Sequence, residues 1–128
     1  MIEVETKKPV EVLDLTTLVQ KAVAESKVDS GIALVYTLHT TTALVVNEAE
    51  PGLIQDLVDT MAKMIPRGAG YRHDGSDGNA HAHLQAALLG NSAVLPVDGG
   101  CPVLGTWQRV LFVELDGPRH RRIYIKVI

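Results

Sequence analysis

Histidines, aspartates and glycines are concentrated in one short segment of the sequence, residues 71–83. This segment holds three of the five histidines in the chain, together with two aspartates and two glycines. Neutral imidazole binds metals such as zinc and exchanges protons near physiological pH, and neighbouring carboxylates orient such rings or act as bases. A hydrophobic core rarely needs so dense a run. The segment therefore predicts a site of chemistry.

Three histidines from three different segments provide the number of ligands that a catalytic zinc ion commonly takes. His39 follows an apolar run, His73 lies within the histidine-rich segment and His83 ends it. Three protein ligands would leave one position open for water or substrate. No compact ligand motif joins these residues, so only the fold could gather them. The alternative is that each histidine is a surface residue or a hydrogen-bonded structural one.

His81 and His83 are two positions apart, so the local structure decides whether they can act together. On a strand they would share a side, whereas on a helix they would diverge by about 200°. If a helix starts at Ala80, only one of them can face a pocket. We expect this to be His83, because it shares a helix face with the small residues Ala86 and Ala87. His81 is then expected to cap the helix or to be exposed.

The acidic and amide side chains of the same segment have two interpretations. Asp74 and Asp77 can orient a histidine, hold magnesium or act as a general base. They are also the residues that a solvated loop uses to turn. Asn79 precedes the predicted helix and can cap it through its side-chain oxygen.

Further polar residues follow predicted strands. Thr41 lies in a run of three threonines after His39, where a hydroxyl can contact a ligand. Asn47 and Glu48 add polar groups to such a site or simply end a strand. Gln108 is a candidate ligand contact, while its neighbour Trp107 is expected in the core or at a subunit interface.

Three arginines near the end of the sequence can bind phosphate. Arg119, Arg121 and Arg122 carry guanidinium groups that match phosphate oxygens. Such a run more often forms a solvated sheet edge, which is the interpretation favoured in the absence of a visible partner. Cys101 lacks the histidine and asparagine context of a nucleophile and is expected to be a structural or incidental thiol.

Bulk properties limit the class of protein. A chain of 128 residues fits one domain with an ordinary core. The net charge of −3 and a pI near 5.9 disfavour broad binding to nucleic acid. The charged N-terminal segment does not resemble a signal peptide, no apolar run is long enough to cross a membrane, and the single cysteine is compatible with a reducing compartment. We expect a cytoplasmic protein with no membrane partner.

Hydrophobic periodicity predicts a mixture of strands and helices. Alternation with a period of two indicates strands, and a period near 3.6 bounded by caps, Pro51 and Gly90 indicates helices. The strands are expected at residues 2–6, 10–15, 32–39, 43–46, 92–97, 106–115 and 120–128, and the helices at 16–28, 51–65 and 80–89. Short turns between many strands favour one antiparallel α+β domain over residues 1–128.

Several short motifs, taken in order, resemble the small-protein family typified by bacterial YjbQ. The resemblance covers nearly the whole chain and implies an antiparallel β-sandwich with helices, assembled as a homotrimer with pockets near subunit boundaries. The motifs are His39-Thr-Thr-Thr-Ala43, Asn47-Glu48, Tyr71-Arg-His-Asp74, Asn79-Ala-His-Ala-His-Leu84, Leu89-Gly-Asn-Ser92, Leu95-Pro-Val97, Gly105-Thr-Trp-Gln108 and Asp116-Gly-Pro-Arg119.

This resemblance also implies an activity, that of a secondary thiamine-phosphate synthase enzyme. The reaction would join hydroxymethylpyrimidine diphosphate to a thiazole phosphate and release pyrophosphate, with a divalent cation, zinc or magnesium, and basic groups neutralising the diphosphate. A metal-dependent hydrolase of a phosphorylated small molecule and a non-catalytic trimeric ligand-binding protein are the alternatives. The hypothesis assigns metal binding to His39, His73 and His83, catalysis to Asp74, Glu48 and His73, and substrate contacts to Thr41, Asn47, Asn79, Gln108, Arg119 and Arg121.

Overall fold

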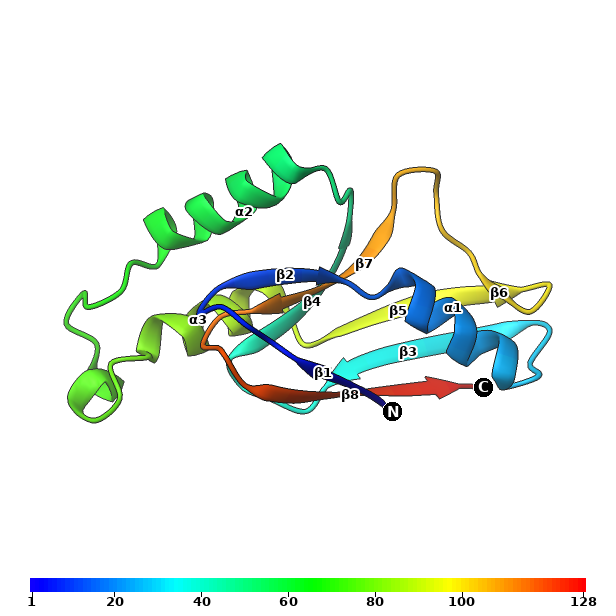
Figure 1. The fold of residues 1–128 in the computed structure, drawn as a ribbon, viewed down its shortest axis with the longest axis horizontal. Coiled ribbons are helices and arrows are strands. Elements are labelled where there is room, and N and C mark those ends of the chain that lie inside the picture. Colours follow the sequence, from blue (N-terminus) through cyan, green and yellow to red (C-terminus); the bar gives the residue numbers. More distant parts are fainter.

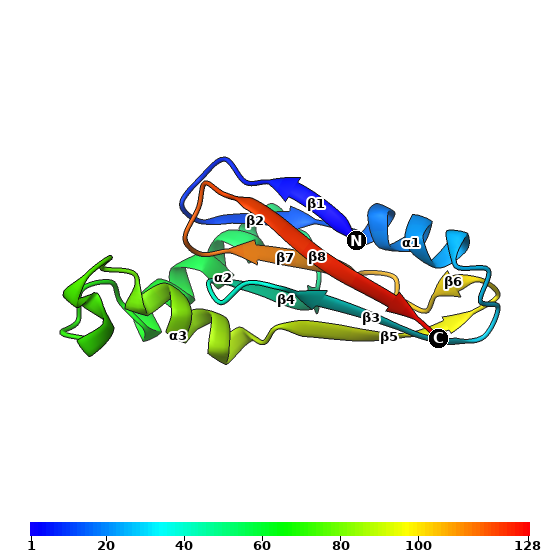
Figure 2. The same ribbon diagram turned by 90° about the horizontal axis from the view of Figure 1, so that it is seen from below.

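Two antiparallel sheets and three helices make up the protein, as seen in a computed structural model that describes all residues 1–128 (Figures 1 and 2). The five-stranded sheet has the order β1-β8-β3-β5-β6, and the three-stranded sheet has the order β2-β7-β4. The strands are β1 (Ile2–Glu5), β2 (Glu11–Asp14), β3 (Gly31–Thr37), β4 (Thr42–Asn47), β5 (Ser92–Asp98), β6 (Cys101–Pro102), β7 (Arg109–Glu114) and β8 (His120–Val127). The helices are α1 (Thr16–Glu25), α2 (Pro51–Met64) and α3 (Ala80–Leu89), with a 3₁₀ turn at Arg72–Gly75.

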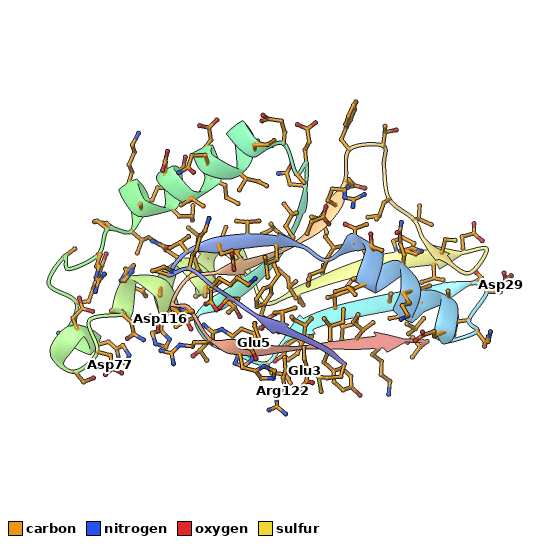
Figure 3. All side chains as sticks on the ribbon, in the orientation of Figure 1. Glu3, Glu5, Asp29, Asp77, Asp116 and Arg122 are labelled. Atoms are coloured by element: carbon orange, nitrogen blue, oxygen red, sulfur yellow. The ribbon has the colours of Figure 1, made fainter.

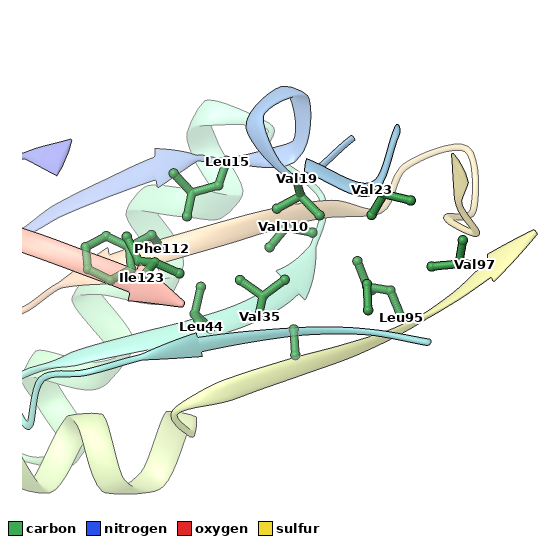
Figure 4. Packing of buried hydrophobic residues seen from close by; sticks show 12 residues of the cluster. Leu15, Val19, Val23, Val35, Leu44, Leu95, Val97, Val110, Phe112 and Ile123 are labelled. Carbon is green, nitrogen blue, oxygen red and sulfur yellow. The ribbon is translucent and has the colours of Figure 1, made fainter. Parts of the chain in front are cut away.

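The main hydrophobic core lies between the two sheets (Figure 4). Alternate residues of each strand point into it, which is the consequence of the two-residue period of a strand. In β5 the pattern of burial alternates strictly. Helix α1 adds to the layer of the three-stranded sheet and packs on the same core. The fully buried core side chains include Phe112, Leu44, Val110, Val35, Ile123, Val19 and Val23.

A second, smaller core lies on the other face of the three-stranded sheet. Ala82 and Ala86 of α3 pack there against Ala43, Val113 and Leu115. The central strand β7 is thus covered on both faces, which explains why residues 110–115 are almost uninterruptedly apolar. Packing of α3 on this sheet fixes the position of the two histidines on that helix.

Helix α2 is packed much more loosely than α1 and α3. Met61 is its only buried residue. Figure 1 shows the helix standing beside the sheets rather than against them. Its C-terminal end is joined to α3 by Gln85, whose Nε2 donates to the carbonyl oxygens of Met61 at 3.3 Å and Ile65 at 3.0 Å. None of the three helices is long and apolar enough to span a bilayer.

The expected antiparallel α+β fold is confirmed, and the bounds of α3 are those predicted. Helix α1 is shorter than predicted and ends at Glu25 instead of residue 28. The Ser26 hydroxyl donates to the Val23 carbonyl, and Lys27 adopts a positive φ of 63°, so the helix cannot continue. The 3₁₀ turn at Arg72–Gly75 and the short strand β6 were not predicted.

Two strand ends also differ from the prediction. Strand β3 stops at Thr37, so His39 lies in the turn that follows the strand. Strand β7 begins at Arg109 and not at residue 106. The preceding turn is closed by Gln108, whose Oε1 accepts a hydrogen bond from the Gly105 backbone N–H at 2.8 Å.

Candidate functional site

Two turns, the start of α3 and the start of β8 meet at one end of the molecule and line an open cavity of about 320 Å³, named here the histidine cavity. Figure 3 places Asp116 at this end, beside α3, and Asp29 at the opposite end. An adjoining cavity of about 270 Å³ shares His39, Thr40 and His83 with it. The lining of the histidine cavity comprises Leu38, His39, Thr40, Thr41, Asn79, His83, Asp116, Arg119 and Arg121. The fold therefore brings together residues that are far apart in the sequence. His39 and Arg122, for example, are 83 positions apart and are joined by a hydrogen bond.

His39 is held in one tautomer by a backbone hydrogen bond. Its Nε2 accepts the N–H of Arg122 at 2.9 Å. Burial, followed by the positive charges of Arg121 and Arg122, lowers the pKa of His39 below its usual 6.5. A neutral ring whose Nε2 is an acceptor carries its proton on Nδ1. His39 is therefore suited to donate a hydrogen bond from Nδ1 to a ligand oxygen.

His73 and His83 contact each other beside this cavity. Their ring centroids lie 4.8 Å apart with the planes at 85°. His83 lines the same cavity as His39, whereas His81 lines a separate cavity under α2. The helical spacing predicted this divergence of His81 and His83, but His81 neither caps the helix nor is exposed, and its Nδ1 is buried. The three histidines His39, His73 and His83 thus lie at one end of the molecule.

These three histidines do not form a ready-made three-ligand metal site in this arrangement. No group of three or more His, Cys, Asp or Glu side chains lies at spacing that could hold a metal ion. The Nε2 lone pair of His39 is occupied by the Arg122 N–H. His73 and His83 make no hydrogen bond through their ring nitrogens, so these two fit as ligands while His39 does not. Metal dependence stays a prediction.

Arg121 is buried, which corrects the expectation of a solvated edge for this residue, whereas Arg119 and Arg122 are exposed as expected. Its guanidinium contacts the buried carboxylate of Glu114 through Nε to Oε1 at 2.7 Å and Nη2 to Oε2 at 2.5 Å. Nη2 also donates to Thr41 Oγ1 at 2.8 Å. Burial alone raises the pKa of Glu114, but hydrogen bonds from Arg121 and Thr6 outweigh it and hold that pKa below its usual 4.5. The pair is ionised and fixes the floor of the histidine cavity.

Arg119 is the more accessible of the two cavity arginines. Its Nε donates to the Asp116 carbonyl at 2.8 Å, and its Nη2 contacts Asp116 Oδ2 at 3.1 Å, while its side chain stays 55% exposed. Asn79 Nδ2 donates to the same Oδ2 at 3.0 Å. Burial raises the pKa of Asp116, but the hydrogen bonds from Asn79 and Arg119 outweigh it and leave that pKa lowered. Asp116 therefore links Asn79 to Arg119 and orients the arginine.

Asp74, and not Asn79, caps helix α3. Asp74 Oδ1 accepts the backbone N–H of Ala80 at 2.9 Å, and Asn79 makes no side-chain capping bond. The expectation of a cap by Asn79 was wrong: its amide is turned so that Nδ2 donates to Asp116, and its Oδ1 accepts no backbone N–H of the helix. The other oxygen of Asp74, Oδ2, is buried and has no hydrogen-bond partner.

Asn47, Glu48 and Gln108 lie outside the histidine cavity. Asn47 ends β4, which begins at Thr42 on the cavity side, so about five residues of extended chain, roughly 17 Å, separate the two positions. Gln108 is bonded within its own turn. Trp107 is 70% exposed, so it does not belong to the core of the chain. Glu48 and Trp107 line one shallow cavity at this far end.

Two central residues were not among the predicted site residues. Glu114 was counted as part of a strand, although a carboxylate inside the apolar run of residues 110–115 requires a buried partner. Asp116 precedes Gly117 and Pro118, where an aspartate is expected simply as a turn residue. The signal for Arg121 was its shared parity with Ile123 in β8, which places both side chains on the inner face.

Comparison with known proteins gives the family of the chain. The sequence model of the family described as UPF0047 protein YjbQ-like matches residues 1–128. The chain belongs to this family. A UPF0047 protein of Archaeoglobus fulgidus is 54% identical over 127 residues, which cover 99% of this chain and 98% of the relative. The UPF0047 protein YugU of Bacillus subtilis is 34% identical, covering 99% of this chain and 96% of the relative.

Solved structures of UPF0047 YjbQ-like proteins share the fold. A YbjQ-like protein of unknown function from Sulfolobus solfataricus superposes with a TM-score of 0.96 at 40% identity, covering 98% of this chain and 92% of that one. An uncharacterised YjbQ/UPF0047 protein from Clostridium acetobutylicum gives a TM-score of 0.95 at 39% identity, covering 99% and 98%. The two-sheet arrangement described above is therefore the arrangement of the family.

Proposed function

We propose that this YjbQ-like protein binds a phosphorylated small molecule in the histidine cavity and acts as a thiamine-phosphate synthase-like transferase. The observation that supports this is the meeting of two arginines, Arg119 and Arg121, with the donor face of His39 around one open cavity. Guanidinium groups suit phosphate oxygens, and a neutral imidazole N–H adds a donor without adding a titrating charge. The substrates proposed are hydroxymethylpyrimidine diphosphate and a thiazole phosphate.

The proposed reaction requires charge stabilisation more than proton transfer. The thiazole nitrogen forms a bond to the pyrimidine methylene carbon, while the bond from this carbon to the diphosphate oxygen breaks. The electron pair leaves with pyrophosphate, and the ring nitrogen becomes a quaternary cation without losing a proton. Arg119, which is exposed, would contact the departing diphosphate. Arg121, whose charge is balanced by Glu114, would hold Thr41 in place at the floor of the cavity.

A divalent cation is part of the proposal, with His73 and His83 as its protein ligands. Such an ion would neutralise the diphosphate. Zinc titration followed by dialysis and elemental analysis tests this. Stoichiometric zinc in the wild type and in His81→Ala, but not in His83→Ala, is the expected result. Full zinc content in His83→Ala would remove these histidines as ligands.

The activity is tested by supplying both thiamine precursors and measuring thiamine phosphate and pyrophosphate. Arg119→Gln should raise KM roughly 10- to 100-fold, the cost of losing a hydrogen bond to a charged group. Lys21→Gln is the matched control, because it removes one positive charge from an exposed position on α1, outside the lining of the cavity. Pyrophosphate or phosphate release from one precursor alone would favour a hydrolase. Saturable binding without turnover would favour a ligand-binding protein.

We also propose that the protein is a homotrimer that uses the outer face of the five-stranded sheet. This face carries Ile32, Tyr36, Val94 and Tyr124, which are 39–63% exposed, and no helix crosses β3 or β8 in the view of Figure 2. Tyr36 and Tyr124 are cross-strand partners, so the apolar surface is continuous. Large exposed apolar patches mark interaction sites. Val94→Lys should dissociate the assembly in light scattering coupled to size exclusion; an unchanged mass would exclude this face.

A further inference from the structure

A second cavity lies under α2, on the other side of α3 from the histidine cavity. It has a volume of about 270 Å³ and is more enclosed than the histidine cavity. We name it the α2 cavity. Half of its 16 lining residues are hydrophobic and come mainly from α2, α3 and the outer face of the three-stranded sheet, with Leu57, Met61, Leu89, Val113 and Leu115 among them. Its polar lining residues are Arg67, Asp77, Asn79, His81, Gln85 and Asp116. An apolar wall combined with polar side chains is the lining of a small-molecule site.

Two polar side chains at one end of the α2 cavity have an atom without a partner. Asn79 uses its Nδ2 to bind Asp116, and its Oδ1 is buried without any donor. His81 Nδ1 is also buried without a hydrogen bond. Both residues line the α2 cavity. Because nearly all buried polar atoms in folded proteins are paired, two such atoms beside one cavity point to a missing partner.

The chemistry of these two atoms restricts what that partner can be. An amide oxygen only accepts, so Asn79 Oδ1 requires an N–H or O–H donor. His81 Nδ1 accepts or donates according to its tautomer, so it can pair with either edge of a nitrogen heterocycle. The volume is near the lower end of the range of about 300–1000 Å³ that small-molecule sites occupy. A ring-sized ligand fits this space better than a dinucleotide.

We propose that the α2 cavity is a binding site for a small apolar ring that carries an N–H donor, such as a nitrogen heteroaromatic. The ring packs between Met61 and Val113, and its N–H meets Asn79 Oδ1 once a small displacement of α2 opens that atom, which is buried in the empty cavity. Because Met61 is the only buried residue of α2, this helix can adjust to admit the ring at little cost in packing. The site does not depend on the proposed transferase activity.

The α2 cavity and the histidine cavity share one wall. Asn79 and Asp116 line both. A ligand that bonds Asn79 Oδ1 therefore contacts the residue that helps to orient Asp116 and, through it, Arg119. Occupancy of one cavity is thus sensed at the other through a chain of two hydrogen bonds.

The experiment uses two probes of the same shape that differ in their donor. Indole has one ring N–H, and 1-benzothiophene has sulfur in its place. Each is titrated into the full-length, ¹⁵N-labelled protein and followed by amide NMR signals. We expect indole to shift the signals of Met61, His81 and Val113, and 1-benzothiophene to bind roughly 2- to 10-fold more weakly, the factor of one net hydrogen bond. No shift with indole, or equal affinity for both probes, would overturn the proposal.

Variants of α2 test whether indole binds inside the α2 cavity. Ala62→Trp fills the cavity from α2 and should abolish indole binding, whereas Met64→Trp, on the same helix but outside the lining, should not. Asn79→Leu, which removes the acceptor oxygen, should bring the affinities for the two probes closer together. Inorganic phosphate serves as a separate probe of the histidine cavity, read at His39 and His83. If the wild-type protein binds indole but not phosphate, the proposed function alone is rejected. If Ala62→Trp still binds indole, the α2 site alone is rejected.

Discussion

Arg121 and Glu114 form an ion pair that is closed to solvent directly beneath the histidine cavity. The arginine is 4% exposed and the glutamate 0%, and two parallel hydrogen bonds of 2.7 and 2.5 Å join them. The Thr6 hydroxyl and the Asp116 backbone N–H also donate to the carboxylate, and Thr41 Oγ1 accepts a second hydrogen bond from Nη2 of the guanidinium. Five segments of the chain thus converge on one pair of charges, which makes this pair the support of the site.

Removing one partner of this pair should be costly, because an uncompensated charge would stay buried. We expect Arg121→Met to lower the free energy of unfolding by about 3–5 kcal/mol. Arg122→Gln, one residue further along β8 but exposed, should change it by no more than about 0.5 kcal/mol. Urea unfolding monitored by circular dichroism measures both.

A double variant tests whether the cost comes from the unpaired charge. Combining Arg121→Met with Glu114→Leu should destabilise the protein by less than the sum of the two single changes, because no isolated charge remains. Strict additivity would show that the two side chains do not stabilise each other.

The pKa values of His39 and His120 should be shifted in opposite directions, although the two side chains belong to neighbouring segments. Burial and the charges of Arg121 and Arg122 lower the pKa of His39, and hydrogen bonds with Glu5 and Glu3 raise the pKa of His120. NMR titration of the imidazole signals should give a midpoint below 6.5 for His39 and above 6.5 for His120. The opposite order would contradict the hydrogen bond from Arg122 to His39.

The same shift gives the sign of the pH effect of His39 on stability. Since its folded pKa lies below 6.5, the unfolded chain binds the proton more readily in the window between the two values. The contribution of His39 to stability is therefore complete above about pH 6.5 and lost as the pH falls through the folded pKa. Replacing His39 by Gln should flatten the stability profile in that window.

Asp116 predicts a second loss of stability at lower pH. Its pKa is held below 3.8 by Asn79 and Arg119 in spite of burial, so its contribution is complete above 3.8 and lost as the pH falls through the lowered value. Asp116→Asn should reduce the fall in the urea midpoint between pH 5 and pH 3 relative to the wild type. A variant profile parallel to that of the wild type would show that Asp116 does not contribute to this fall.

The sequence predicts those parts of the molecule that depend on local pattern. The bounds of α3 follow from its composition and from Gly90, whose φ of 102° ends the helix. The divergence of His81 and His83 follows from the helical period alone. Other features depend on partners distant in the chain. The burial of Arg121 requires Glu114. Gln108 lies outside the cavity because the start of β7, Arg109, pairs with Asn47 at the far end of β4 and not with Thr42 on the cavity side. Local periodicity carries no information about such pairings.

Gly117 lies at a point where no side chain can be added without displacing its neighbours. A Cβ atom there would come within 2.8 Å of Glu114 Cγ and 2.9 Å of Thr6 Oγ1, besides the Lys8 carbonyl oxygen. Since both Glu114 and Thr6 are fixed by the buried ion pair, neither can move cheaply. We expect Gly117→Ala to destabilise the protein by about 1–3 kcal/mol, the usual cost of overpacking. Gly75→Ala is the matched control, because a Cβ at that position meets nothing within 4 Å. Thermal and urea unfolding of both variants would measure the difference, and equal stability would show that the turn at Asp116 yields more readily than its contacts imply.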